Sequence, residues 1–202
     1  MQERGITRAT LGRLPMYLRY LQSLPAEQKT ISAAAISREL GLGEVQVRKD
    51  LSSVSSDGRP RIGYVTKDLT DQLKKYLGQN QPRQVVIVGA GKLGRALLDY
   101  DGFSDFGIEI AAAFDAKLEK EEHSASGKPI YPLEELAAFC YRSDIRIGII
   151  TVPQSAAQEV CDRMVKCNLT ALWNFSPCVL KVPPHVRVHQ ENLALSLAYL
   201  VK

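Results

Sequence analysis

The apolar positions near the start of the chain recur every three or four residues, the spacing of an α-helix with one buried face. In residues 7–24 these positions are Leu11, Leu14, Leu18 and Leu21. Pro15 lies inside this span, so we expect the helix to begin near the proline or to kink there. The span therefore predicts one amphipathic helix, with Pro15 marking its start or a bend.

Two further helices are predicted on either side of a short turn. Ser32 can cap a helix over residues 33–40, residues 41–43 contain two glycines that end it, and another helix begins at about Glu44. A short helix, a tight turn and a second helix make a helix-turn-helix. The side chains expected to face the core are Ala35, Ile36 and Leu40 of the first helix and Val45, Val47 and Leu51 of the second.

The helix after the turn is expected to contact DNA. Its outward side chains include Gln46, Arg48, Lys49 and Ser52. Arg48 can bridge two acceptors of a guanine in the major groove, and Gln46 can pair with adenine. We expect Lys49 and Ser52 to contact phosphate instead.

A winged hairpin is predicted next along the chain. Asp57-Gly58 is a turn signal between short strands, and Arg59 and Arg61 flank Pro60 at the tip. A rigid hairpin with two arginines can enter a minor groove, where the narrow width concentrates negative potential. The alternative for the whole segment is a small helical domain with a solvated basic face.

The charge distribution favours a polyanionic partner for the first part of the chain. Residues 1–81 contain 13 Lys+Arg and 8 Asp+Glu, a net charge of +5, whereas residues 82–202 contain 13 and 14, a net charge of −1. All of the excess positive charge, +4 for the whole chain, therefore lies in the first 81 residues.

The second part of the chain alternates strand and helix patterns. A polar linker at residues 78–83 is followed by an apolar strand at 84–88, a G-x-G-x-x-G sequence and an amphipathic helix, RALLDY. Further strands are expected at 108–114, 145–151 and 171–175, and helices near 133–141 and at 155–166. This alternation predicts a parallel sheet with helices on both faces.

The glycine-rich turn predicts a dinucleotide site, formed by Gly89, Ala90, Gly91, Lys92, Leu93 and Gly94. Gly89 allows the tight turn, Gly91 lets a pyrophosphate approach the backbone, and Gly94 lets the helix pack closely on the strand. Asp115 follows the next strand, 21 residues after Gly94. Its carboxylate can bind both adenosine ribose hydroxyls and repel a 2′-phosphate, which favours NAD(H). The alternatives are another nucleotide, coenzyme A, or a fold that has lost its ligand.

Catalytic and metal-binding patterns are missing from the sequence. The four cysteines form no C-x-x-C pair and there are only three histidines, so we expect reduced thiols, no structural zinc and no redox dithiol. His185 and His189 lie in HVRVH, which reads as an edge strand, and each is expected to be a surface or packing residue. There is neither an apolar run of 18 residues nor a signal-peptide core, so a cytoplasmic protein is expected.

These motifs together resemble the Rex family of redox-sensing transcriptional repressors, over nearly the whole chain. RLPMYLRYL resembles the first helix of the family, VQVRKDLS its recognition helix and GRPRIGY its wing. VVIVGAGKLGRALLDYDGF, AAAFD, IGIITVP and LWNFSPCVLKVP resemble successive parts of its nucleotide domain. The resemblance implies a homodimer that binds an inverted-repeat operator in double-stranded DNA and senses the NADH/NAD⁺ ratio, with NADH releasing the DNA.

The resemblance also implies roles for individual residues. Arg48, Lys49 and Arg61 would contact DNA, and Gly89, Gly91, Gly94 and Asp115 would hold the adenine half of the cofactor. Tyr100 would lie near the nicotinamide, with Thr151, Val152, Pro153 and residues 174–177, beginning at Asn174, lining the pocket floor.

The sequence departs from the family at the implied switch, which maps to Arg19, Tyr100, Asn192 and Leu193. Family members often carry an aspartate, followed by an apolar or aromatic residue, before the last helix. That aspartate alternates between the tyrosine and an arginine of the partner subunit. Asn192 carries no charge and Leu193 no ring, and the last helix, about residues 191–201, is short. We therefore expect a weakened response to NADH.

The sequence thus predicts an α/β protein of two domains. Residues 1–80 form a winged helix-turn-helix, and residues 81–202 form a Rossmann-like NAD(H)-binding and dimerisation domain with a C-terminal helix. The predicted function is repression controlled by the NADH/NAD⁺ ratio, with no enzymatic activity. Two alternatives remain: a dimeric DNA-binding repressor with little or no redox response, and a small NAD-dependent oxidoreductase.

Overall fold

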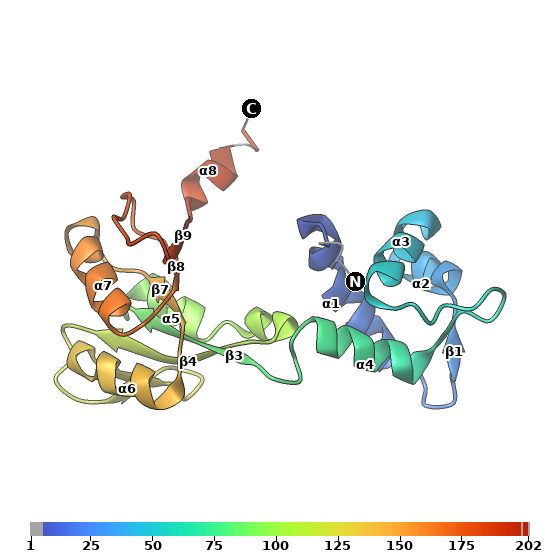
Figure 1. The fold of residues 1–202 in the computed structure, drawn as a ribbon, viewed down its shortest axis with the longest axis horizontal. Helices are drawn as coiled ribbons and strands as arrows, with labels where there is room; N and C mark the ends of the chain where they lie inside the picture. The colour runs from blue at the N-terminus through green and yellow to red at the C-terminus, as the bar shows by residue number, and fades with distance from the viewer. Residues whose placement is uncertain (1–5, 199, 202) are drawn as a thin grey trace. The chain divides into compact units, whose positions relative to one another are not determined.

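The computed structural model describes residues 6–198 and 200–201 (Figure 1). The chain divides into two compact units, Met1–Pro82 with Ser104–Gly107 and Arg83–Phe103 with Ile108–Lys202. We expected a single boundary after residue 80; here the short segment Ser104–Gly107 groups with the first unit. None of the helices in the described residues is long and apolar enough to span a bilayer.

The N-terminal unit is a small helical domain with a two-stranded sheet (Figure 1). Its elements are α1 (Arg8–Ser23), β1 (Thr30–Ile31), α2 (Ala33–Leu40), α3 (Glu44–Val54), β2 (Tyr64–Val65) and α4 (Thr66–Tyr76). Strands β1 and β2 pair antiparallel. The core is formed by buried side chains from all four helices and both strands, among them Leu14, Tyr17, Ile36, Val47, Leu51, Tyr64, Leu69 and Leu73.

Helix α1 runs through Pro15, so the helix start expected at this proline is wrong. The helix begins at Arg8, and the Thr7 side chain caps it by accepting a hydrogen bond from the Thr10 backbone N–H at 3.1 Å. Three of the four expected leucines, Leu14, Leu18 and Leu21, are buried, but Leu11 is 38% exposed. The cap at Thr7 therefore sets the helix start at Arg8, seven residues ahead of the proline.

The helix-turn-helix forms as predicted, with one error in its core. Ser32 caps α2 by accepting a hydrogen bond from the Ala35 backbone N–H at 3.1 Å, and Gly41 ends α2 with a left-handed φ of 64°. Val47 is fully buried, but Val45, which we expected in the core, is 64% exposed. Two residues correspond to about 200° around a helix, so these two valines cannot share one face.

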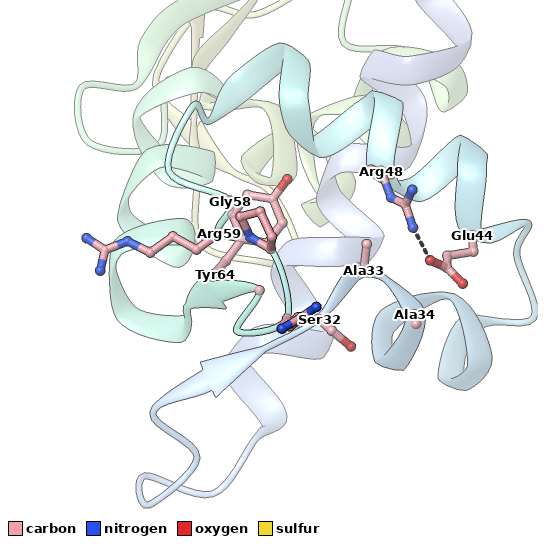
Figure 2. A pocket seen from close by; sticks show the side chains of 11 residues that line it. Ser32, Ala33, Ala34, Glu44, Arg48, Gly58, Arg59 and Tyr64 are labelled. Carbon is pink, nitrogen blue, oxygen red and sulfur yellow. Dashed lines mark hydrogen bonds and ion pairs between the residues drawn. The ribbon is translucent and has the colours of Figure 1, made fainter.

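The wing forms at a different turn from the one expected. The reversal runs from Arg59 to Gly63, whose backbones exchange hydrogen bonds of 2.8 and 2.9 Å, and not around Asp57-Gly58. Gly58 instead packs against Tyr64, as Figure 2 shows, and a Cβ there would lie 2.7 Å from the tyrosine ring. Strand β2 then pairs with β1. This pairing requires a glycine at Gly63, because its φ is +85° and a Cβ there would lie only 2.2 Å from a β1 carbonyl oxygen.

The C-terminal unit is built on a seven-stranded sheet with the order β5-β6-β4-β3-β7-β8-β9. Its strands are β3 (Arg83–Val88), β4 (Ile108–Asp115), β5 (Glu122–His123), β6 (Pro129–Pro132), β7 (Ile147–Ile150), β8 (Ala171–Asn174) and β9 (Arg187–Gln190). Its helices are α5 (Lys92–Leu98), α6 (Leu136–Ser143), α7 (Gln154–Lys166) and α8 (Leu193–Ala198), with the 3₁₀ segment η2 (Leu133–Glu135). A further 3₁₀ segment, η1 (Asp101–Phe106), begins in this unit and ends in the segment Ser104–Gly107 of the first unit. All neighbouring strands are parallel except the β5–β6 pair.

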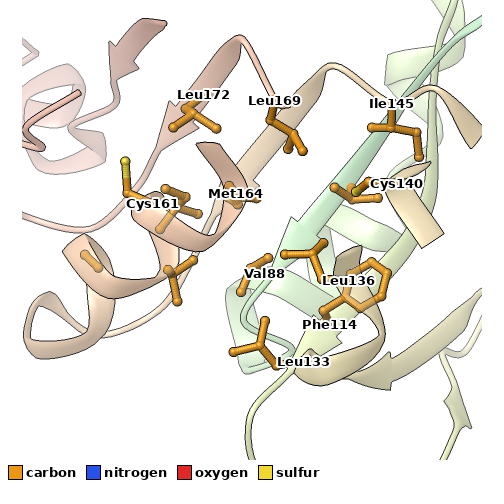
Figure 3. Packing of buried hydrophobic residues seen from close by; sticks show 14 of the residues in the cluster. Val88, Phe114, Leu133, Leu136, Cys140, Ile145, Cys161, Met164, Leu169 and Leu172 are labelled. Carbon is orange, nitrogen blue, oxygen red and sulfur yellow. The ribbon is translucent and has the colours of Figure 1, made fainter. Parts of the chain in front are cut away.

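Alternate residues of the central strand β3 face two separate cores. Val86 and Val88 pack with α6 and α7 in the cluster drawn in Figure 3. Val85 and Ile87 face the opposite side, with Leu98 of α5. Helices therefore cover both faces of the sheet, which confirms the predicted doubly covered α/β architecture.

Several segments differ from their predicted bounds. Strands β5 and β6 and the segment η1 were not predicted. The expected strand at 145–151 shortens to β7, the helix near 133–141 divides into η2 and α6, and the C-terminal helix shortens to α8. The expected edge strand over HVRVH forms only in part: β9 contains His189, whereas His185 lies in a turn before it, and both side chains are exposed. Cys140, Cys161, Cys167 and Cys178 are free thiols.

The turn between β3 and α5 depends on two glycines. A Cβ on Gly94 would lie 1.8 Å from the Gly89 carbonyl oxygen and 3.0 Å from Thr151 Oγ1. Gly89 has a φ of +106°, and a Cβ there would lie 2.9 Å from the Thr151 backbone. The Thr151 hydroxyl donates a 2.7 Å hydrogen bond to the Gly89 carbonyl, which fixes the turn against the end of β7.

We predict that Gly94→Ala lowers the free energy of unfolding by about 3 kcal/mol, because its methyl group collides with backbone that cannot move aside. Gly91→Ala is the matched control: its Cβ meets no atom within 4 Å, so its effect should stay below about 0.5 kcal/mol. Chemical denaturation of both variants measures the difference. Equal stabilities would show that the turn has more room than its geometry indicates.

Candidate functional site

A pocket of about 520 Å³ opens where β3, β4 and β7 end. It is lined by Val88, Gly89, Ala90, Gly91, Arg95, Asp115, Ala116, Lys117, Leu118, Leu133, Thr151, Val152, Pro153, Ala156 and Val160. The carboxyl end of a parallel sheet is where α/β folds bind nucleotides. Gly91 leaves open space beside the turn, because a Cβ on it would meet nothing within 4 Å. The pocket therefore fits a ligand that approaches the backbone at this glycine.

Asp115 anchors the glycine-rich turn as well as lining the pocket. Its Oδ2 accepts a hydrogen bond from the Ala90 backbone N–H at 2.7 Å, and its Oδ1 accepts one from the Lys117 N–H at 2.9 Å. Each carboxylate oxygen has lone pairs to spare after these bonds. The carboxylate is thus held in one orientation and retains acceptor capacity for a ribose hydroxyl.

The predicted cofactor residues divide into those that line the pocket and those that do not. Gly89, Ala90, Gly91, Asp115, Thr151, Val152 and Pro153 line it, whereas Lys92, Leu93, Gly94, Tyr100 and Asn174 are absent from its lining. Asn174 is fully buried, and its amide nitrogen donates to the carbonyls of Ser176 and Cys178 at 3.2 and 3.0 Å. Its side chain therefore braces the loop after β8.

Arg95 is a pocket residue that the sequence reasoning missed. Its Nε donates to the Ala90 carbonyl at 3.0 Å, and its Nη2 contacts Glu122 at 2.8 Å. Arg95 and Lys117 are the basic side chains of the lining, so the pocket carries positive charge next to Asp115. A basic residue directly after the last glycine of the motif was the available signal. No group of three or more metal-ligating side chains occurs in the described residues.

A second pocket, also of about 520 Å³, lies between the helix-turn-helix and the wing (Figure 2). Arg48, Arg59 and Arg61 are three of the predicted DNA-binding residues, and they line it together. Glu44 lies one helical turn before Arg48 and forms an ion pair with it. The structure thus brings Arg48 of α3 and both arginines of the wing to one surface.

The other predicted DNA-binding residues, Gln46, Lys49 and Ser52, are exposed on α3. Ser52 donates a hydrogen bond to the Lys49 carbonyl at 2.9 Å. Gln46 lies against Arg13 of α1, and when its amide is oriented with the oxygen toward the guanidinium, that oxygen accepts hydrogen bonds at 3.0 to 3.2 Å. Gln46 therefore has a protein partner as well as an outward position.

A buried carboxylate, Asp50, fixes α3 against α1. Arg13 donates to it from Nε and Nη2 at 2.7 and 2.9 Å, and the Tyr17 hydroxyl donates at 2.7 Å. Burial opposes ionisation of Asp50, but the hydrogen bonds from Arg13 and Tyr17 outweigh it and lower the pKa of the carboxyl. Burial, together with the Asp50 carboxylate, raises the pKa of Tyr17 to about 12. This group has no local sequence signal, because Arg13 and Tyr17 lie 37 and 33 residues before Asp50 in the chain.

The implied switch residues belong to both units, Arg19 to the N-terminal unit and Tyr100, Asn192 and Leu193 to the C-terminal unit. Tyr100 is 57% exposed and contacts Phe103 edge to face, with ring centroids 5.2 Å apart. Arg19 is paired with Asp105 in the N-terminal unit. The side chain of Asn192 caps α8 by accepting a hydrogen bond from the Leu195 N–H at 3.0 Å. Leu193 is 58% exposed.

Comparison with known proteins agrees with this two-part geometry. Residues 5–52 match a family model described as "Putative DNA-binding protein N-terminus", and residues 80–178 match one described as "CoA binding domain". The redox-sensing transcriptional repressor Rex of Pelotomaculum thermopropionicum is 40% identical over 99% of this chain and 94% of its own length. Rex of Streptomyces coelicolor is 38% identical over 98% of this chain and 78% of its own.

Solved structures of a Rex-family repressor are also similar to this chain. The Rex-family repressor RSP, in a crystal structure with β-NAD⁺ and operator DNA, is 32% identical with a TM-score of 0.78, covering 98% of this chain and 91% of that one. RSP in complex with β-NADH has a TM-score of 0.69, covering 97% and 92%. Fold and pockets thus define a DNA-binding protein with a Rossmann-like ligand domain. The chain belongs to the Rex family of redox-sensing transcriptional repressors.

We predict that Asp50→Asn lowers the free energy of unfolding by about 2–4 kcal/mol at pH 7, because Arg13 then lies beside an uncharged partner. Because the pKa of Asp50 is lowered in the folded state, its carboxylate adds to the free energy of unfolding at pH values above the unfolded-state pKa of about 4. This stabilisation is lost as the pH falls from there through the folded-state pKa.

Chemical denaturation between pH 7 and pH 3 should therefore show that the difference in free energy of unfolding between wild type and Asp50→Asn decreases below about pH 4. Asp71→Asn, an exposed change on α4, is the control and should leave stability nearly unchanged. A gap that stays constant down to pH 3 would contradict the assignment of an ionised Asp50.

Proposed function

We propose that this protein is a dimeric repressor whose binding to an operator in double-stranded DNA is controlled by the NADH/NAD⁺ ratio. The helix-turn-helix and wing bind the operator, and the pocket at the ends of β3, β4 and β7 binds NAD(H). The observation that supports this proposal is that one chain of the Rex family contains both pockets, one lined by arginines and one at the glycine-rich turn.

The residues proposed for the cofactor are those around the glycine-rich turn. The open side of Gly91 would receive the pyrophosphate, with Arg95 beside it, and Asp115 would accept hydrogen bonds from the adenosine ribose. When bound, the cofactor supplies a reporter of redox state, since its two forms differ only at the nicotinamide ring. Tyr100, Thr151, Val152 and Pro153 are proposed for that end.

The residues proposed for DNA contact are Gln46, Arg48, Lys49, Ser52, Arg59 and Arg61. All six are exposed. Arg48 and Gln46 are assigned to bases, Lys49 and Ser52 to phosphates, and the wing arginines to the adjacent minor groove. The alternative of an oxidoreductase has less support, because no histidine lines the nucleotide pocket in the part of the chain that the structure describes.

The direct test is a titration of the protein with its operator alone, with NAD⁺ and with NADH. We expect NADH to weaken operator binding and NAD⁺ to leave it nearly unchanged. Equal affinities in all three conditions would contradict redox control, and absence of operator binding would contradict the proposal as a whole.

We predict that Asp115→Asn narrows the preference for NADH over NADPH by about ten-fold, which corresponds to about 1.4 kcal/mol. The asparagine keeps an acceptor for the Ala90 N–H but removes the charge that repels a 2′-phosphate. Fluorescence titration with both cofactors measures the ratio. Asp162→Asn, the same charge change on exposed α7, should not move it. An unchanged ratio in Asp115→Asn would place the ribose elsewhere.

We predict that Asn192→Asp enlarges the response to NADH about five-fold, or about 1 kcal/mol of coupling free energy. Aspartate caps a helix as well as asparagine does, so the α8 cap at Leu195 is kept while a charge is added. The measurement is the ratio of operator affinities without and with saturating NADH. Asn168→Asp is the control, at an exposed site after α7. A large wild-type ratio that Asn192→Asp leaves unchanged would contradict a role for the missing charge.

A further inference from the structure

A carboxylate lies among the arginines of the proposed DNA-binding surface. The pocket between α2, α3 and the wing is lined by Arg48, Arg59 and Arg61, and Glu44 is the acidic side chain among the described residues of its lining (Figure 2). Glu44 Oε1 accepts a hydrogen bond from Arg48 Nη2. The two side chains are 44% and 65% exposed, so both remain accessible from solvent.

Stabilisation of α3 accounts for only part of this arrangement. A glutamate in the first turn complements the positive end of the helix, and an i,i+4 pair with arginine adds a small further term. A first-turn glutamate and an i,i+4 ion pair would stabilise α3 equally well on a face of the helix away from the pocket. A carboxylate on a surface proposed to contact DNA also repels phosphate, so it weakens the sequence-independent attraction of that surface to the DNA backbone.

We propose that Glu44 is a positioning residue that makes Arg48 select a base over a phosphate. This inference rests on the proposed function as an operator-binding protein. Arginine has five N–H donors in a fixed planar fork, and Glu44 occupies one of the terminal nitrogens. The remaining donors are enough for the two neutral acceptors of a guanine.

The pairing changes the two kinds of contact in opposite ways. Non-specific binding depends on the attraction of cations to phosphate, and a guanidinium neutralised by a neighbouring carboxylate contributes little to it. Hydrogen bonds to neutral base acceptors need donor geometry instead of net charge, and the ion pair holds the Arg48 fork in one orientation. Glu44 therefore raises the ratio of operator affinity to non-specific affinity.

The experiment compares wild type, Glu44→Gln and Glu39→Gln on an operator duplex and on a duplex of scrambled sequence, at several salt concentrations. Glu39 is exposed on α2 and outside the pocket lining, so Glu39→Gln makes the same change in net charge. We expect Glu44→Gln to bind the scrambled duplex two- to five-fold more tightly, the size of an exposed ion pair. The non-specific salt slope should steepen by about 0.9, one additional phosphate contact.

A double variant tests whether Glu44 acts through Arg48. In an Arg48→Ala background, Glu44→Gln should no longer change the ratio of operator to non-specific affinity beyond the Glu39→Gln control. A ratio that stays unchanged in Glu44→Gln, or one that changes equally without Arg48, would overturn the proposal. Failure of the wild type to prefer the operator would instead contradict the proposed function, so the two failures are distinguishable.

Discussion

The buried carboxylate of Asp50 is the contact on which the geometry of the DNA-binding unit depends. It is nearly inaccessible, so its charge must be satisfied internally, and Arg13 and Tyr17 on α1 do so. Helix α3 is thereby fixed to α1 by directional bonds as well as by apolar packing. The same helix α1 carries Arg19, which binds Asp105 in the segment Ser104–Gly107. Within this unit α1 connects α3 to that segment.

The nucleotide unit depends on a different constraint, the close approach of backbone to backbone at the glycine-rich turn. Gly94 packs on the Gly89 carbonyl, which in turn accepts a hydrogen bond from the Thr151 hydroxyl. This contact aligns the ends of β3 and β7, and the bond from the Ala90 N–H to Asp115 aligns β4 with them. The pocket walls are thus set by contacts of the chain with itself, so a ligand meets a largely preformed site.

Local patterns predicted most of the fold because they depend on neighbours in sequence. Leucine spacing located the helices, and the strand–glycine–helix order located the nucleotide turn. Features that depend on distant partners could not be predicted in this way. In the sequence Asp50 is indistinguishable from a surface acid, because its partner Arg13 lies 37 residues away and only the fold brings the two together. Asn174 reads as a pocket residue, yet the loop after β8 folds back on it and buries it.

The two redox forms of the cofactor share one adenine half, so contacts there contribute affinity without discriminating between NADH and NAD⁺. The residues proposed for that half, from Gly89 to Asp115, are assembled within a single chain. Discrimination must come from the nicotinamide end, for which Tyr100 is one of the residues proposed, and Tyr100 is 57% exposed. The half of the proposed site that the two forms share is thus fixed by the fold of one chain, whereas the half that must distinguish them includes an exposed side chain.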